Sequence, residues 1–407
     1  VVGNVATGLM VVSAGTVTGG GGTIGYAAGS FGTLVISNGA TMGFSSLSIG
    51  QQAGATGAVW ISSGQLAVTN SAKSTLYVGY TGVGQLTVSN GAALSSVAYV
   101  GYNGGSQGTL TVAGGTATIS SALNIGYSPG ATGAVWLTGG RLVNNGTASA
   151  IIGAFGNGQL TTTAGSMQAG SVTVGQNAGS HGSLTVSGGT ISVFSSLVVG
   201  DCATTASGQV SVVSGGSLYV TNAGDTAFLD VRHGTLVVGT GGVVQVDKLV
   251  MTNACGLLVR SGGTLVVSNL VLDPNLSAVG DGIPNGWKQQ YGLDPLDPTL
   301  AGKDLDGSGL TVYQDYLAGL DPTNPASSFR IISVVPSGID LRVTWRMGSG
   351  KTNALQVTAG DANGGYNTNN FTDIFTVTDT VGTVTNYLDL GAATNTPSRF
   401  YRVRLVP

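Results

Sequence analysis

Glutamate is absent from this 407-residue sequence, so every acidic side chain is an aspartate. Charged residues make up 8% of the chain, and its 14 lysines and arginines form no basic stripe that would neutralise nucleic-acid phosphates. The lack of glutamate and the shortage of lysine also disfavour helix bundles and coiled coils. No apolar run approaches the ~20 residues that span a bilayer. We therefore expect no nucleic-acid partner and no transmembrane segment.

Cysteine is also scarce. Cys202 and Cys255 are too few for a disulfide framework. In the repeat described below they fall two coils apart. They would be ~9.6 Å apart if both lay on the stacked strands, beyond the ~7 Å between Cα atoms that a disulfide allows. A disulfide would form only if the cysteines lay in loops that leave the sheet. We therefore expect two free thiols.

Glycine, in contrast, is abundant, with 70 residues. It recurs in a motif in which an apolar residue follows two positions after a first glycine and a second glycine follows seven positions after it. Eleven copies are spaced 22 to 27 residues apart. Their first glycines are Gly8, Gly32, Gly57, Gly84, Gly108, Gly133, Gly158, Gly182, Gly208, Gly234 and Gly256.

The repeat predicts short parallel strands. Apolar residues alternate after the first glycine, and a second signal of the type Leu47-Ser-Ile49-Gly50 follows in each repeat. A meander would instead show two-residue hairpin turns every 8–12 residues. Residues 1–272 are therefore predicted to form a parallel β-solenoid of about eleven coils. We attribute the second glycine of each copy to a turn with positive φ.

These repeats resemble a known family. Gly108-Thr-Leu-Thr-Val-Ala-Gly-Gly and Gly182-Ser-Leu-Thr-Val-Ser-Gly-Gly are similar to the glycine-rich repeats of autotransporter passengers and of secreted PEP-CTERM-type bacterial proteins. The resemblance covers about residues 4–272 and implies a right-handed parallel β-helix, exported to the extracellular space or cell surface. The sequence begins at Val1 rather than methionine, which indicates a processed or truncated product.

Aromatic residues occupy outward positions of the predicted coils. Trp60 and Trp136 fall in one column of the first strand, and Tyr80, Tyr102 and Tyr127 follow a glycine in three successive coils. All five are candidates for a surface that binds glycans or a neighbouring subunit. The alternative is that they stack along the sheet and stabilise it. We favour a contact surface for the tryptophans and stacking for the tyrosines.

Charges are too sparse for a polysaccharide-cleaving β-helix enzyme, which needs carboxylates gathered on one face. Residues 1–200 contain only Lys73 and Arg141 as charged groups. Asp230, Arg232 and His233 crowd together where the repeat decays, and we interpret them as a solvated loop. The sequence predicts no catalytic residues and no enzyme.

The composition changes in residues 273–328, which carry eight aspartates against Lys288 and Lys303. The spacing of Asp304, Asp306, Ser308 and Asp315 is that of an EF-hand loop, with the backbone carbonyl of Leu310 as a further ligand. Asp315 stands where glutamate is usual. The run from Leu310 to Leu320 is predicted to be a short helix that ends at Gly319.

This connector also resembles bacterial thrombospondin type 3-like calcium repeats, including the stretch Asp281-Gly-Ile-Pro-Asn-Gly-Trp287. The resemblance implies Ca²⁺ at the Asp304–Asp315 loop and a second ion at Asp281 and Asn285, with a structural role. The alternative is a polar linker whose aspartates cap turns.

Residues 329–407 return to alternation, with six or seven strands that predict a β-sandwich. The strand with Trp345 and the stretch Phe400-Tyr-Arg-Val403 resemble fibronectin type III-like modules. The whole chain is therefore predicted to be all-β, with a β-helix, a calcium-binding connector and a C-terminal sandwich.

Three functions are compatible with this organisation. The first is an exported structural protein that polymerises head to tail with itself through β-helix and β-sandwich contacts. The second is a monomeric adhesin or glycan-binding stalk. The third, a polysaccharide-degrading enzyme, is disfavoured by the shortage of carboxylates.

Overall fold

The computed structural model describes residues 1–69, 74–361, 363–378, 384–394 and 398–406, with only the backbone of residues 145–148. The chain divides into two compact units, Val1–Val279 and Gly280–Pro407. The first seven residues of the predicted connector thus belong with the solenoid, and the rest of the connector shares a unit with the C-terminal strands. No helix in the described part of the chain combines the length and apolarity needed to cross a membrane.

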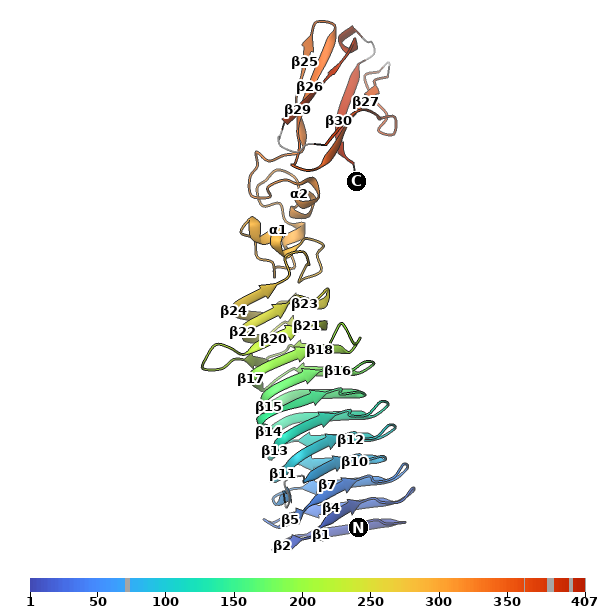
Figure 1. Ribbon diagram of the computed structural model, residues 1–407, viewed down its shortest axis with the longest axis vertical. Coiled ribbons are helices and arrows are strands. Elements are labelled where there is room, and N and C mark those ends of the chain that lie inside the picture. The colour runs from blue at the N-terminus through green and yellow to red at the C-terminus, as the bar shows by residue number, and fades with distance from the viewer. Residues whose placement is uncertain (70–73, 362, 379–383, 395–397, 407) are drawn as a thin grey trace. The chain divides into compact units, whose positions relative to one another are not determined.

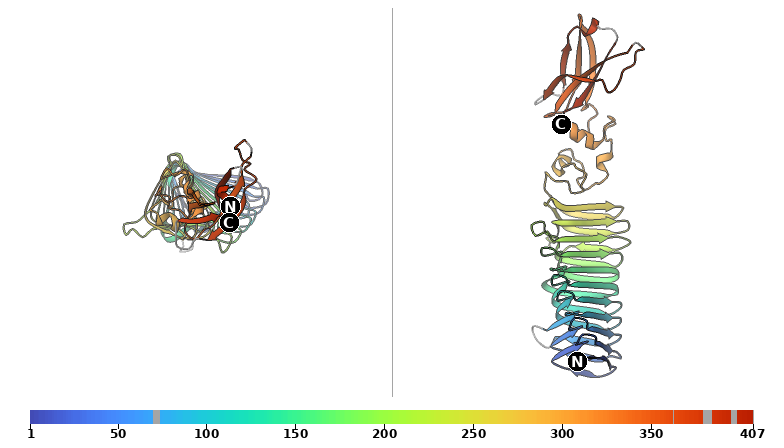
Figure 2. Two further views of the ribbon diagram at one scale, coloured as in Figure 1. Left: turned by 90° about the horizontal axis from the view of Figure 1, so that it is seen from above. Right: turned by 90° about the vertical axis from the view of Figure 1, so that its right-hand side faces the viewer.

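The first unit is the predicted parallel β-solenoid, of about ten turns (Figures 1 and 2). Each coil contributes up to three strands, and each strand pairs in parallel with its counterpart one coil later. We call the places of the three strands within a coil the first, second and third positions. Several strands continue through a bend from one position into the next, so the strands differ in length. The strands at the first position are β1 (Thr7–Val12), β4 (Phe31–Ile36), β7 (Thr56–Ile61), β10 (Val83–Val88), β12 (Gln107–Val112), β14 (Thr132–Ile152), β15 (Asn157–Val174), β16 (His181–Val186), β18 (Ser207–Val212), β21 (His233–Gly239) and β23 (Cys255–Ser261).

The second and third positions complete the coils. Short strands at these positions are β2 (Thr16–Thr18), β3 (Gly21–Ile24), β5 (Thr41–Phe44), β6 (Ser46–Ile49), β8 (Gln65–Val68), β9 (Thr75–Val78), β19 (Ser217–Val220) and β20 (Phe228–Val231). Longer strands that serve both positions are β11 (Ala92–Val100), β13 (Thr116–Ile125), β17 (Thr190–Val199), β22 (Val243–Met251) and β24 (Thr264–Leu272).

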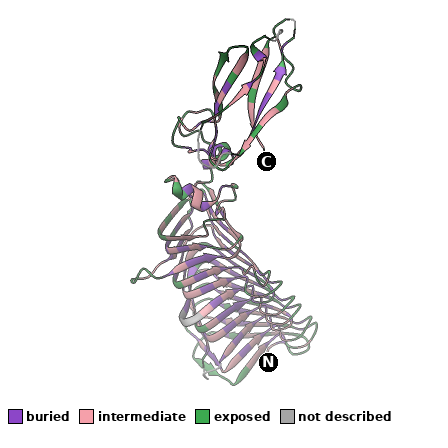
Figure 3. Ribbon diagram, turned by 45° about the horizontal axis from the view of Figure 1, so that its top comes forward, coloured by how far each residue is buried: buried purple, intermediate pink, exposed green. Residues whose placement is uncertain are grey.

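The repeat glycines form one continuous column, which confirms the predicted register. Gly8 pairs with Gly32, Gly108 pairs with Gly133, and the same pairing continues to Gly234 and Gly256. Burial alternates along each strand, as Figure 3 shows, and residues such as Leu34 and Ile36 are fully buried. The core is therefore a stack of aliphatic side chains from successive coils.

The explanation of the second glycines is correct for six copies and wrong for five. Gly15, Gly39, Gly165, Gly189, Gly215 and Gly241 have positive φ, whereas Gly64, Gly91, Gly115, Gly140 and Gly263 do not. At the latter positions a Cβ atom would overlap a backbone oxygen of the preceding coil, as at Gly91 against Gly64. Glycine is required there because two backbones approach closely.

The connector folds around the cluster of Ile283, Leu300 and Val312. Its helices are α1 (Asn285–Gln290), η1 (Leu300–Gly302) and α2 (Val312–Ala318). A capping box between Thr311 and Gln314 begins α2, and Gly319 ends it with φ of 70°. The predicted short helix before Gly319 is confirmed.

The last part of the chain is two antiparallel three-stranded sheets, in the orders β25-β26-β29 and β28-β27-β30. Trp345 is fully buried between them and packs with Val343, Met347 and Leu355. The predicted sandwich is therefore present as six described strands, together with the short helix η2 (Ala392–Thr394). The strands are β25 (Arg330–Ser337), β26 (Asp340–Arg346), β27 (Thr352–Ala359), β28 (Thr372–Thr378), β29 (Val384–Asp389) and β30 (Arg399–Leu405).

Candidate functional site

The outward side chains of the first-position strands form one surface, which we call the first-strand face. It consists of the residues one position before, one position after and three positions after each repeat glycine. Trp60 and Trp136 lie on it in one column, because Trp60 pairs with Thr87, Thr87 with Thr111, and Thr111 with Trp136. Trp60 is 47% exposed, a large exposed fraction for an indole, and Trp136 is half-buried. The predicted tryptophan column is confirmed.

A shallow hollow of about 660 Å³ continues the first-strand face beyond Trp136. Its lining includes the repeat glycines at the start of β14, β15, β16, β18 and β21. Its sides carry amide, hydroxyl and imidazole groups, and His181 Nδ1 lies 2.6 Å from Ser207 Oγ. Sequence reasoning missed this hollow, although the polar residues flanking each repeat glycine are visible in the repeat.

The tyrosines form two adjoining columns rather than one. Tyr80, Tyr102 and Tyr127 stack with ring centroids 5.2 and 5.3 Å apart. Tyr77 and Tyr99, which sequence reasoning did not single out, stack beside them at 5.4 Å. Burial raises the pKa of Tyr77 and Tyr99, and the neighbouring phenols raise it further.

The ring faces of these tyrosines are turned to one another within each column, and the two columns meet edge to face. Such pairs stabilise a fold by about 0.5–1.5 kcal/mol each. The arrangement therefore supports the stacking interpretation of Tyr80, Tyr102 and Tyr127, and it leaves few faces open to a ligand.

The predicted calcium loop is closed by its own hydrogen bonds. Asp304 accepts from the backbone N–H groups of Gly307 and Gly309, and Asp306 accepts from that of Ser308. Asp315 is buried, and its Oδ1 atom has no hydrogen-bond partner, as is also true of Asp306 Oδ2. In the described residues, no three Asp, His or Cys side chains already meet at the distances of a bound metal.

Burial and charge repulsion in this loop both change the pKa of Asp315. Burial, and then the charges of Asp306, Asp304 and Asp321, raise the pKa of Asp315 from 3.8 to about 6. The chemistry of the oxygen donors fits a hard cation, which would relieve both the repulsion and the two unpartnered oxygens. The loop would have to draw its carboxylates together to bind one.

The residues of the second predicted ion site do not form one together. Lys288 Nζ lies 2.7 Å from Asp281 Oδ2, and the side chain of Lys288 is fully buried. Asp281 Oδ1 accepts from the backbone N–H of Ile283, and Asn285 is buried at the start of α1. Because a lysine already compensates the carboxylate, we do not propose an ion at Asp281 and Asn285.

Other aspartates of the connector cap turns, as the alternative interpretation expects. Asp294 and Asp321 each accept from the backbone N–H two residues later. Burial alone would raise the pKa of Asp297, but hydrogen bonds from Lys303 and Thr299 outweigh it and lower the pKa to about 2. Asp294, Asp297 and Asp321 cap turns and are not among the predicted calcium ligands, whereas Asp304 and Asp306 both cap the loop and are candidate ligands.

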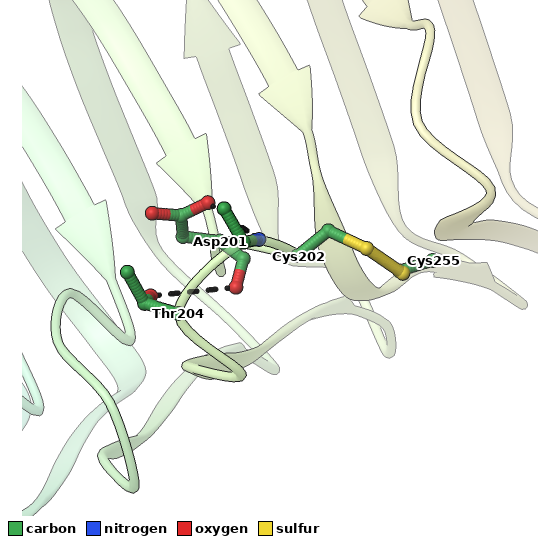
Figure 4. Close-up of a disulfide and its surroundings, with 5 residues drawn as sticks. Asp201, Cys202, Thr204 and Cys255 are labelled. Carbon is green, nitrogen blue, oxygen red and sulfur yellow. Dashed lines mark hydrogen bonds between the residues drawn. A yellow bond between two sulfur atoms is a disulfide. The ribbon is translucent and has the colours of Figure 1, made fainter.

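The prediction of two free thiols is wrong. Cys202 and Cys255 form a disulfide, with their Cα atoms 5.9 Å apart (Figure 4). Cys255 begins a first-position strand, but Cys202 lies in a loop that leaves the sheet after β17 and closes where Asp201 pairs with Ala206. The ~9.6 Å expected from stacking does not apply, because one cysteine is off the stack.

The charged group near the end of the solenoid forms an internal ion pair. Arg232 Nε lies 2.6 Å from Asp230 Oδ2, and Asp230 is buried rather than in the predicted solvated loop. His233 lies in β21 beside them, and its register partner is Cys255. The only carboxylate of this pair, that of Asp230, is buried and bonded to Arg232. The pair therefore does not supply two solvent-facing carboxylates side by side.

Comparison of the chain with family models, with curated proteins and with solved structures finds no match.

Proposed function

We propose that this chain is an exported structural protein whose solenoid polymerises head to tail with further copies. The observation that supports this most is the unbroken parallel register of the repeat glycines from Gly8 to Gly256. Coils that stack in one fixed way present at each end the same kind of edge that they use internally. In the described residues β1 pairs with β4 on one side, and in this proposal its other side receives the next copy.

Export to the extracellular space or cell surface belongs to the same proposal. Disulfides persist in oxidising compartments and are rare in the cytosol, so the Cys202–Cys255 bond supports this localisation. The solenoid repeat and the six-stranded sandwich around Trp345 also support kinship with autotransporter or PEP-CTERM-type repeats and with fibronectin type III-like modules.

We infer that the connector takes up a structural Ca²⁺ ion. Its ligands would be Asp304, Asp306, Ser308, the carbonyl of Leu310, and Asp315. The support is the buried Asp315 carboxyl, whose Oδ1 atom has no hydrogen-bond partner and which is repelled by Asp306, Asp304 and Asp321. Calorimetric titration with calcium up to millimolar concentration tests this, with Asp315→Asn as the variant and Asp297→Asn as the control. Absence of heat in the unaltered chain would contradict it.

Negative-stain microscopy and sedimentation of the full chain at micromolar concentration test polymerisation. We expect regular fibres that lengthen with protein concentration. Met10→Lys places a charge at a half-buried inward position of the first coil and should shorten the fibres, whereas Leu9→Lys at the neighbouring exposed position should not. Monodisperse particles at every concentration would remove the proposal.

A second candidate function, glycan binding, is favoured by a different observation, namely the open first-strand face.

A further inference from the structure

We propose that the first-strand face between Trp60 and Thr235 binds a neutral polysaccharide that lies along the stack of coils. This activity goes beyond the structural role, because a scaffold needs no ligand. The site combines two exposed or half-exposed indoles with a hollow that is lined in part by amide and hydroxyl side chains. The hollow begins beside Trp136, since Ala134 of the same strand lines it.

The chemistry of the hollow selects a neutral, hydroxyl-rich ligand. Among its lining residues, all of which the structure describes, there is no aspartate, lysine or arginine. The residues that line it include Asn157, Gln159, Gln209 and Ser183. Amides and hydroxyls both donate and accept hydrogen bonds, as sugar hydroxyls do. An anionic polymer would find no lysine or arginine there.

The two tryptophans supply apolar contacts for sugar rings. An indole face carries negative electrostatic potential, which attracts the weakly positive C–H groups on one face of a pyranose. Trp60 and Trp136 are three register steps apart, about 14 Å at the spacing of parallel strands, with the short side chains of Thr87 and Thr111 between them. A chain that follows the axis can therefore meet both indoles.

The comparison with the tyrosines strengthens this assignment. The rings of Tyr80, Tyr102 and Tyr127 stack on one another and so use up their own faces. The described rings include no aromatic contact to Trp60 or Trp136. A second copy of this chain is the other occupant to consider. It would have to cover the amide groups of Gln159 and Gln209 and replace the water they bind, which costs free energy unless each finds a partner.

An array of neutral and anionic oligosaccharides, followed by calorimetry, tests the proposal. The neutral probes are hexasaccharides of β-1,4-linked glucose, mannose, xylose and N-acetylglucosamine, and the anionic probes are hyaluronan and alginate fragments. We expect at least one neutral probe to bind and the anionic probes to fail. Trp136→Ala should weaken binding at least about tenfold, and Gln209→Ala should weaken it several-fold.

Phe194→Ala is the matched control, because Phe194 is 46% exposed but lies in β17, outside the first-strand face. Thermal unfolding of each variant shows whether the fold is intact. Three results would overturn the proposal: no neutral probe bound at millimolar concentration, binding of anionic probes alone, or equal affinity of Trp136→Ala and Phe194→Ala. Loss of self-association in Trp136→Ala with unchanged glycan binding would assign the face to a second copy instead.

Discussion

The solenoid and the unit that follows it are ordered by different means. In the solenoid, backbone hydrogen bonds join each coil to the next in one register, and residues 1–200 contain only two charged side chains. In residues 280–407, aspartate side chains close the turns and a buried lysine pairs with Asp281. The first unit therefore depends on the absence of side chains at its glycines. The second depends on particular side chains being present.

This difference predicts opposite sensitivities to substitution. Adding a methyl group at a repeat glycine should destabilise the solenoid, whereas removing a single charged side chain should destabilise the connector. Four experiments test the contrast.

The largest effect is expected at the repeat glycines. A Cβ atom at Gly108 would overlap the carbonyl oxygen of Val78 at the end of β9, so Gly108→Ala should lower the free energy of unfolding by more than about 4 kcal/mol. Gly20→Ala is the control, because a Cβ there meets nothing within 4 Å. Denaturant unfolding followed by circular dichroism measures both. Equal stabilities of the two variants would contradict this prediction, because they would mean that neighbouring coils shift enough to accommodate the added methyl group.

The disulfide should have the next largest effect. It closes a loop with a sequence separation of 53 residues, for which chain entropy predicts a loss of about 4 kcal/mol on removal. The double variant Cys202→Ser/Cys255→Ser should unfold earlier, and hydrogen exchange should increase mainly in β18 to β23. A reducing agent should reproduce this in the unaltered chain and leave the double variant unchanged. No response to reduction would mean that the thiols are not bonded.

In the connector, Lys288→Met should cost about 3 kcal/mol, because Asp281 would lose the cation that compensates it in the interior. Lys303→Met removes the exposed partner of Asp297 and should cost at most about 1 kcal/mol. Unfolding monitored by tryptophan fluorescence compares the two. Similar losses of unfolding free energy in the two variants would contradict the view that burial determines how much each ion pair contributes to stability.

The smallest expected effect is a dependence on pH. The folded pKa of Asp315 is about 6 against 3.8 ordinarily, so the folded chain binds more protons than the unfolded chain between these values. Without calcium, stability should therefore fall as pH rises from about 4 to about 6. Asp315→Asn should flatten this part of the profile, whereas Asp297→Asn should not, because the pKa of Asp297 lies near 2. A profile identical in both variants would contradict the assignment.

The repeat made the solenoid predictable because each coil reports the same register. Eleven glycines with alternating apolar residues determine which side chains face inward, and the tryptophan column follows directly. The pattern could not separate the two reasons for a glycine, since Gly39 with positive φ and Gly64 with a crowded backbone look alike in a sequence.

Features outside the repeat were less predictable. Stacking geometry places strand residues but not loop residues, which is why the position of Cys202, and hence its bond, was missed. The pairing of Asp281 with Lys288 was hidden for a similar reason, since the spacing of the aspartates fits an ion site whether or not a lysine folds back onto one of them. Tyr77 and Tyr99 were within reach, because both occupy the outward position of a recognised strand.

The covalent link also bears on how the chain would respond to tension. Coil-to-coil hydrogen bonds can break one coil at a time when the ends are pulled, so a solenoid of this kind would lengthen stepwise. The Cys202–Cys255 bond carries the force past the 53 positions that separate the two cysteines. About 180 Å of contour length would thereby stay hidden from extension. Reduction under load would release it in addition to the steps of the remaining coils, giving the chain a reserve of length that depends on the redox state around it.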